Sequence, residues 1–178
     1  MNGGRHRAAR AFTFVELMIV IVIVGILTAL SIPDGEARAE IQGRRAAETL
    51  EGDLAYARSL SIARPDDPVI IRFDVTNNKY WLARRSTPAT PISHPTRSSA
   101  YVVQFGVNGD PGLTEVSLVA VDLDGDEILE FDALGGIDQD TAAIIQFATS
   151  ASQHEVTVEP VAAKSTYSAS FSQDLIGA

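Results

Sequence analysis

The sequence predicts an α+β fold in which a long, kinked N-terminal α-helix, half of it transmembrane, packs on antiparallel β-sheet. Three observations predict this fold. Residues 12–33 are almost unbroken apolar side chains, residues 36–64 repeat apolar side chains at spacings of three and four, and the chain after Pro68 alternates apolar with polar. These patterns are typical of a membrane-length helix, an amphipathic helix and half-buried strands, in that order.

The apolar run FTFVELMIVIVIVGILTALSIP has the length of a bilayer's hydrocarbon core, because a helix rises about 1.5 Å per residue. Residues 1–11 before it hold three arginines and no acid, so we expect the N-terminus to stay in the cytoplasm. Glu16 is the one charged residue in the run. A carboxylate in a membrane helix costs about 2.5–3.5 kcal/mol, so its presence predicts a functional partner.

The run resembles the N-terminal signature of type IV prepilins and type II secretion pseudopilins. The residues that fall on the family pattern are Phe12, Thr13, Glu16, Leu17, Gly25 and Pro33. The resemblance implies a pilin-like fold, cleavage by prepilin peptidase between Ala11 and Phe12, and N-methylation of Phe12. The family has Gly before the cut, so we expect Ala11 to slow processing without abolishing it.

Cleavage would give Glu16 its partner, since the new ammonium of Phe12 would stand four residues before it. In a filament, the ammonium of one subunit would meet Glu16 of another and select the subunit register. Loss of one buried charge leaves the other unpaired, at about 3–5 kcal/mol. The candidate assembly residues are therefore Glu16, Gly25 and Pro33. The alternative is a Glu16 that snorkels to the membrane surface or is protonated.

Three other interpretations of the run explain its residues less well. A secretory signal peptide would be cut after Ala37-Arg38-Ala39, but the apolar run is longer than an ordinary signal core. A plain single-pass anchor explains neither Glu16 nor Phe12-Thr13. A buried core helix would need more apolar surface around it than the rest of the chain offers.

We expect five segments along the chain. They are a prepilin leader, a transmembrane and assembly helix, an amphipathic continuation of that helix, a β-rich periplasmic domain and a polar C-terminal tail, at residues 1–11, 12–33, 34–64, 65–163 and 164–178. Pro33 predicts a kink between the two parts of the helix. The buried stripe expected on the amphipathic part is Ile41, Ala47, Leu50, Leu54, Ala57 and Leu60.

The rest of the chain predicts short strands. Residues 69–75 and 80–85 form one hairpin, and residues 117–123 and 127–133 form another around Asp124-Gly125-Asp126. Further strands are expected at 101–107, 142–149 and 154–162. The Pro-rich stretch 86–99 predicts a surface loop, and residues 164–178 a frayed end or a short edge strand.

A second resemblance concerns the soluble part. LEGDLAYARSLSIAR (50–64) is similar to the helix end of the GspH/FimT group of minor pseudopilins, through Leu54, Ala57, Arg58, Ser59, Ile62 and Arg64. Phe131 and Gly135 fit the segment that precedes two strands in that group. The resemblance implies a long helix laid on a GspH-like β domain.

Enzymatic and metal chemistry have little support in the sequence. There is no Cys, no recognised nucleophile or phosphate-loop motif, and the three His are scattered, so we expect no enzyme and no cofactor. His94 and His154 are expected to be solvated or hydrogen-bonded. The stretch from Asp122 to Asp126 is similar to a calcium loop, but Glu127 and Ala133 stand at its Gly and Glu positions. A turn is favoured, and Asp122, Asp124 and Asp126 remain the metal candidates.

The favoured function is a minor pseudopilin of a type II secretion pseudopilus, single-pass in the inner membrane with a cytoplasmic N-terminus and a periplasmic C-terminal domain. Its expected partners are other pseudopilins or pilins and the prepilin peptidase/methyltransferase. The alternative is a FimT-like minor type IV pilin that acts in pilus assembly or DNA uptake. A net charge of −9, with Lys164 alone in the C-terminal region, disfavours a nucleic-acid partner.

Overall fold

The computed structural model describes residues 13–30, 35–160 and 165–171. The chain divides into two compact units, Met1–Asp34 and Gly35–Ala178. The predicted leader, the cleavage residues Ala11 and Phe12, and the kink at Pro33 all lie outside the described residues.

In the first unit, α1 (Phe14–Leu30) is a helix of 17 residues with apolar side chains on every side. From Phe14 to Leu27, the large apolar side chains of α1 are between 50% and 74% exposed. In the ranges that the structure describes, no helix is both long and apolar enough to cross a membrane. The transmembrane part of the fold prediction therefore stays a prediction.

The second unit begins with α2 (Gly35–Ala63), which confirms the predicted amphipathic helix. Its buried face includes Ala47, Leu50, Leu54 and Ala57, as expected. The prediction for Ile41 is wrong, since its side chain is 49% exposed. Around Ile41, the buried face of α2 instead carries small and polar residues, namely Ala39, Gln42 and Gly43.

Two antiparallel sheets follow, which confirms the α+β fold class. The first sheet has the order β3-β2-β1-β6 with β4 also paired to β2, and the second has the order β5-β7-β8-β9. In the first sheet the strands are β1 (Val69–Asp74), β2 (Lys79–Arg84), β3 (Thr87–Pro91), β4 (Val102–Gln104) and β6 (Ile128–Glu130). In the second they are β5 (Ser117–Asp122), β7 (Ala143–Ala148), β8 (Ser152–Val158) and β9 (Ser165–Phe171).

The first predicted hairpin is confirmed. β1 and β2 pair antiparallel up to Asp74 opposite Lys79, and Asn78 closes the turn with a φ of 55°. β7 and β8 also pair, as two of the later predicted strands. Within the predicted strand 101–107, only β4 forms, because Gly106 turns the chain with a φ of 85°.

The second predicted hairpin is wrong. β5 pairs with β7, whereas β6 pairs with β1 in the other sheet. The turn itself exists, since Asp124 and Gly125 have φ values of 56° and 100°. It carries the chain from one sheet to the other. An Asp-Gly signal predicts that the chain turns, but the long-range partners decide which strands pair.

The Pro-rich stretch 86–99 is not wholly a loop, because β3 forms within it on the edge of β2. Proline has no amide hydrogen to donate, so it is tolerated on such an edge. The indole Nε1 of Trp81 fixes this strand by donating to the carbonyl of Pro88 at 2.9 Å. In the C-terminal region, β9 adds an edge strand to β8.

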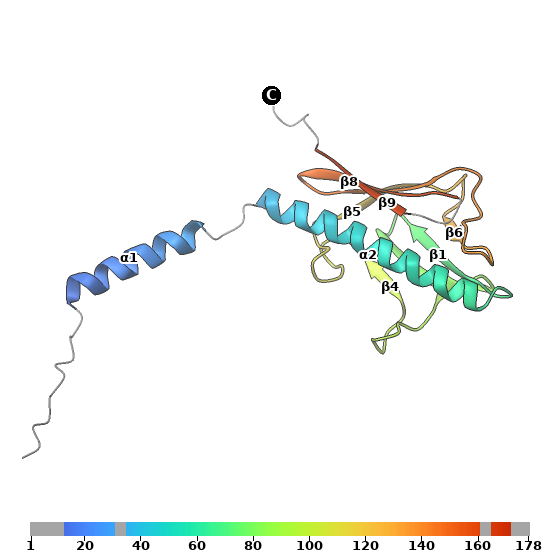
Figure 1. Ribbon diagram of the computed structural model, residues 1–178, viewed down its shortest axis with the longest axis horizontal. Coiled ribbons are helices and arrows are strands. Elements are labelled where there is room, and N and C mark those ends of the chain that lie inside the picture. The colour runs from blue at the N-terminus through green and yellow to red at the C-terminus, as the bar shows by residue number, and fades with distance from the viewer. Residues whose placement is uncertain (1–12, 31–34, 161–164, 172–178) are drawn as a thin grey trace, which may run out of the picture. The chain divides into compact units, whose positions relative to one another are not determined.

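One core joins α2 to both sheets (Figure 1). Phe73 and Leu82 from the first sheet, and Phe147 and Val156 from the second, belong to the same buried cluster as Leu50 of α2. The helix therefore positions polar side chains on its flanks against loops of both sheets.

Candidate functional site

The start of α1 holds the charged residue singled out by the sequence. The hydroxyl oxygen of Thr13 accepts a hydrogen bond from the backbone N–H of Glu16 at 3.2 Å. Thr-x-x-Glu at a helix start is the capping-box spacing, and a carboxylate in the first turn is favoured by the helix dipole. Thr13 thus caps the start of α1, a local role that the Thr-x-x-Glu spacing signals and that was not among the sequence predictions.

Glu16 is exposed, and so is the face of α1 around Gly25. A Cβ placed on Gly25 would meet nothing within 4 Å. Both predicted assembly residues that the structure describes therefore stand on open surface of α1, where a neighbouring molecule can reach them.

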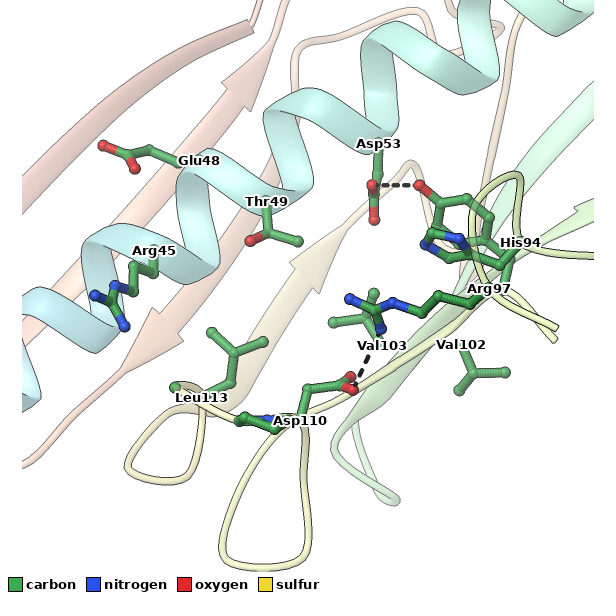
Figure 2. A pocket seen from close by; sticks show the side chains of 13 residues that line it. Arg45, Glu48, Thr49, Asp53, His94, Arg97, Val102, Val103, Asp110 and Leu113 are labelled. Carbon is green, nitrogen blue, oxygen red and sulfur yellow. Dashed lines mark hydrogen bonds and ion pairs between the residues drawn. The ribbon is translucent and has the colours of Figure 1, made fainter. Parts of the chain in front are cut away.

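A polar cavity of about 360 Å³ lies beside α2 in the second unit. Figure 2 shows Arg45, Thr49 and Asp53 lining it from the helix, with Arg97 and Asp110 on the opposite loops. The sequence analysis did not identify this site, because its walls come from segments far apart in the chain.

Asp53 forms the inner end of the cavity and is 8% exposed. Its two carboxylate oxygens accept hydrogen bonds from the phenols of Tyr80 and Tyr101, each at 2.7 Å. Burial raises the pKa of Asp53, and the two phenol hydrogen bonds oppose that rise. Burial raises the pKa of Tyr80 as well. The three side chains form a satisfied polar cluster that joins α2 to β2 and to the start of β4.

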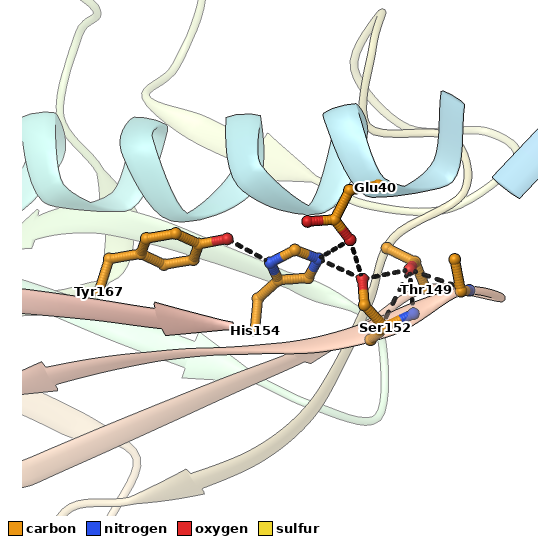
Figure 3. A network of polar contacts seen from close by, with 6 residues as sticks. Glu40, Thr149, Ser152, His154 and Tyr167 are labelled. Carbon is orange, nitrogen blue, oxygen red and sulfur yellow. Dashed lines mark hydrogen bonds and ion pairs between the residues drawn. The ribbon is translucent and has the colours of Figure 1, made fainter. Parts of the chain in front are cut away.

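A second polar network ties α2 to β8 and β9 (Figure 3). His154 is fully buried; its Nε2 lies 2.7 Å from Ser152 Oγ and its Nδ1 lies 2.6 Å from the Tyr167 hydroxyl. The Ser152 hydroxyl donates to Glu40 of α2, whose carboxylate is 3.6 Å from His154 Nε2. His154 is therefore hydrogen-bonded, as the sequence analysis expected.

The Ser152, His154 and Glu40 side chains do not have the arrangement of a hydrolase triad. In such a triad the serine and the acid face different ring nitrogens of the histidine. Here Ser152 and Glu40 face the same nitrogen, Tyr167 faces the other, and Ser152 is 2% exposed. The hydrogen bonds of this network instead hold α2 against β8 and β9.

The burial of His154 predicts a pH-dependent stability. Burial lowers the pKa of His154 from its usual 6.5, and the nearby Glu40 carboxylate opposes this. The unfolded state then binds more protons, so the stabilisation is present above the unfolded pKa and is lost as pH falls through the folded one. We expect the free energy of unfolding to fall between about pH 7 and pH 5, by at most about 1.4 kcal/mol per pH unit.

Chemical denaturation across that pH range measures this effect. His154→Gln should flatten the slope. The raised pKa of Asp53 cannot produce this fall in stability, because the stabilisation that it contributes is lost as pH rises. An unchanged slope in His154→Gln would contradict the assignment.

The metal candidates Asp122, Asp124 and Asp126 do not converge. Asp124 accepts hydrogen bonds from the Asp140 N–H at 2.9 Å and from the Thr141 hydroxyl at 2.8 Å, and Asp126 accepts one from the Ile128 N–H. The bond from Thr141 lowers the pKa of Asp124. Among the described residues, no group of three or more His, Cys, Asp or Glu is placed to hold a metal ion.

Comparison with known proteins identifies a sequence motif in the N-terminal residues. A family model described as the prokaryotic N-terminal methylation motif matches residues 6–32. No significant match was found among curated proteins or among solved structures. The motif supports the type IV pilin and pseudopilin superfamily, and indicates a membrane-anchored, pilus-associated protein that prepilin peptidase processes.

Proposed function

We propose that this type IV pilin-like protein is a minor pseudopilin of a type II secretion system. In this proposal it is held in the inner membrane by a single span, with its C-terminal domain in the periplasm, and then joins a periplasmic pseudopilus. Its role is structural rather than enzymatic. The observation that carries the proposal is the methylation motif at the start of a helix that is apolar on all sides.

The exposure of α1 supports an assembly role. Burial of one large apolar side chain gains about 1.5–3 kcal/mol, and each large apolar side chain from Phe14 to Leu27 is at least half exposed. A surface of this kind requires lipid or other helices around it. A membrane before assembly and a helix bundle in a filament would each cover it.

Glu16 supplies the register in this model. Once residues 1–11 are removed, the ammonium of Phe12 would belong to a residue four positions before Glu16 in the sequence. Among packed apolar helices the two opposite charges need each other, because an unpaired buried charge costs several kcal/mol. Pairing between neighbouring subunits would satisfy both charges and fix the axial step.

The packing of the second unit supports a GspH-like assignment. The two segments that carry that resemblance meet in space, since a Cβ on Gly135 would lie 2.5 Å from Arg58 Nε and 3.0 Å from Ile62 Cδ1. Gly135 has a φ of 81°, which favours glycine. Phe131, in the same segment, is 1% exposed in the shared core. Arg58 and Ile62 of α2 therefore contact the turn that carries Gly135.

The mature N-terminus tests the processing step. We expect intact-mass measurement of the protein from a host with prepilin peptidase to show a chain that begins at N-methylated Phe12. Ala11→Gly should raise the processed fraction, because glycine removes the side chain next to the cut. A chain that begins at Glu40 would instead indicate signal-peptide cleavage after Ala37-Arg38-Ala39 and contradict the proposal.

The secretion system is tested separately in the source organism. Loss of the gene should stop release of folded enzymes into the medium and leave pilus-dependent motility intact. The reverse pattern would favour a minor type IV pilin.

A further inference from the structure

The cavity beside α2 presents hydrogen-bond donors without partners. Within the described part of the chain, neither the Arg45 guanidinium nor the Thr49 hydroxyl has a hydrogen-bond or ion-pair partner. Arg97 has only a contact of 3.9 Å to Asp110 Oδ1, which is too long for a hydrogen bond. All three side chains line the same cavity (Figure 2).

His94 adds a fourth donor. Its Nδ1 accepts a hydrogen bond from the Thr96 N–H at 3.2 Å, so in the neutral ring the proton is on Nε2. The ring is held in place by stacking on Tyr101, with centroids 4.5 Å apart. Nε2 has no partner among the residues that the structure describes.

The guanidinium of Arg45 lies over Gly112, where a methyl group would stand 3.1 Å from one of its nitrogens. Gly112 has a φ of 87°, so this turn both favours glycine and leaves room for the arginine.

Each carboxylate of the cavity, in contrast, already accepts at least one hydrogen bond. Both oxygens of Asp53 accept phenol hydrogen bonds. Asp110 Oδ2 accepts from the Gln104 N–H at 2.9 Å, and Glu48 pairs with Arg44 at 2.8 Å. The unpartnered donors therefore favour a ligand that brings acceptors, and two arginines suit an oxyanion that they can bind through parallel N–H bonds.

We propose that this cavity binds a singly charged carboxylate carried by a compact apolar group. The wall carries two arginines against three carboxylates, so a doubly charged phosphate meets more repulsion than a carboxylate does. Val102, Val103 and Leu113 form an apolar part of the wall, which a hydrocarbon group would cover. The volume suits a small acid or the last residues of a peptide. This site is independent of the filament role proposed above.

The full-length protein in detergent micelles, titrated in a calorimeter, tests the site. The probes are 4-methylpentanoate and the dipeptide acetyl-Ala-Leu with a free carboxylate, with the Leu amide and inorganic phosphate as comparisons. We expect saturable binding of the carboxylates alone. Tighter binding of the acid indicates a free small molecule, and tighter binding of the peptide indicates the C-terminus of another chain; both outcomes support the proposal.

The double variant Arg45→Gln/Arg97→Gln should weaken binding on the order of 100-fold, since charged hydrogen bonds are lost at both residues. The matched control is Arg38→Gln/Arg64→Gln, which removes the same charge from α2 and its C-terminal end, outside the cavity. Absence of saturable binding, equal binding of the amide or of phosphate, or an equal loss in the control would overturn the proposal.

Discussion

Glu16→Ala is expected to leave the protein in the membrane but keep it out of the filament. The substitution removes the carboxylate that the Phe12 ammonium would meet on a neighbouring subunit. That ammonium would then be buried among apolar helices without a partner, at about 3–5 kcal/mol. Because each subunit would carry this penalty, incorporation should fall to background. Sheared or crosslinked filament fractions, compared with total membranes, measure it.

Two control variants separate assembly from other effects. Glu36→Ala removes an exposed acid from the first turn of α2 and should be incorporated normally. Thr13→Ala removes the oxygen that accepts from the Glu16 N–H, which should weaken the helix start by about 1 kcal/mol and leave the carboxylate in place. Mass measurement should show Glu16→Ala cleaved at Phe12. Normal incorporation of a cleaved Glu16→Ala chain would refute the charge-pairing model.

Gly43→Ala and Gly52→Ala are expected to change stability in opposite directions, although both replace a glycine within α2. A Cβ on Gly43 would lie 2.1 Å from Nε2 of the fully buried His154. The ring cannot move away without breaking its bonds to Ser152 and Tyr167. Overpacking and lost hydrogen bonds should outweigh the gain in helix propensity, for a net loss of about 2–4 kcal/mol.

A Cβ on Gly52 would meet nothing within 4 Å, so Gly52→Ala should stabilise the protein by about 0.5–1 kcal/mol through helix propensity alone. Urea unfolding of both variants under one set of conditions measures the contrast. Stabilisation by Gly43→Ala would mean that the contact between α2 and β8 is looser than described.

The different surroundings of these two glycines could not be predicted from the sequence. Both simply weaken a helix when only the sequence is considered, whereas the structure makes Gly43 a contact point and Gly52 a surface position. The position of α2 and the β1–β2 hairpin could be predicted because periodicity and turn residues are local signals. The pairing of β5 with β7 could not be, because it depends on partners far along the chain.

The two candidate sites also differ in whether the sequence predicts them. The hydrogen bond between Thr13 and Glu16 at the start of α1 could be predicted, because the two residues lie within four consecutive positions. The cavity unites Arg45, Arg97 and Asp110, which are brought together only when α2 packs on the sheets. No spacing rule relates these positions, so a sequence pattern could not reveal them.

The hydrogen bonds of Asp124 have a mechanical consequence for a subunit in a filament. The chain passes between the two sheets before β6 and again before β7, and Asp124 on the first passage holds Asp140 and Thr141 on the second. Force applied to one sheet is thus transmitted to the other through both passages and through α2 together. We therefore expect the two sheets of a subunit under load to move together rather than separately.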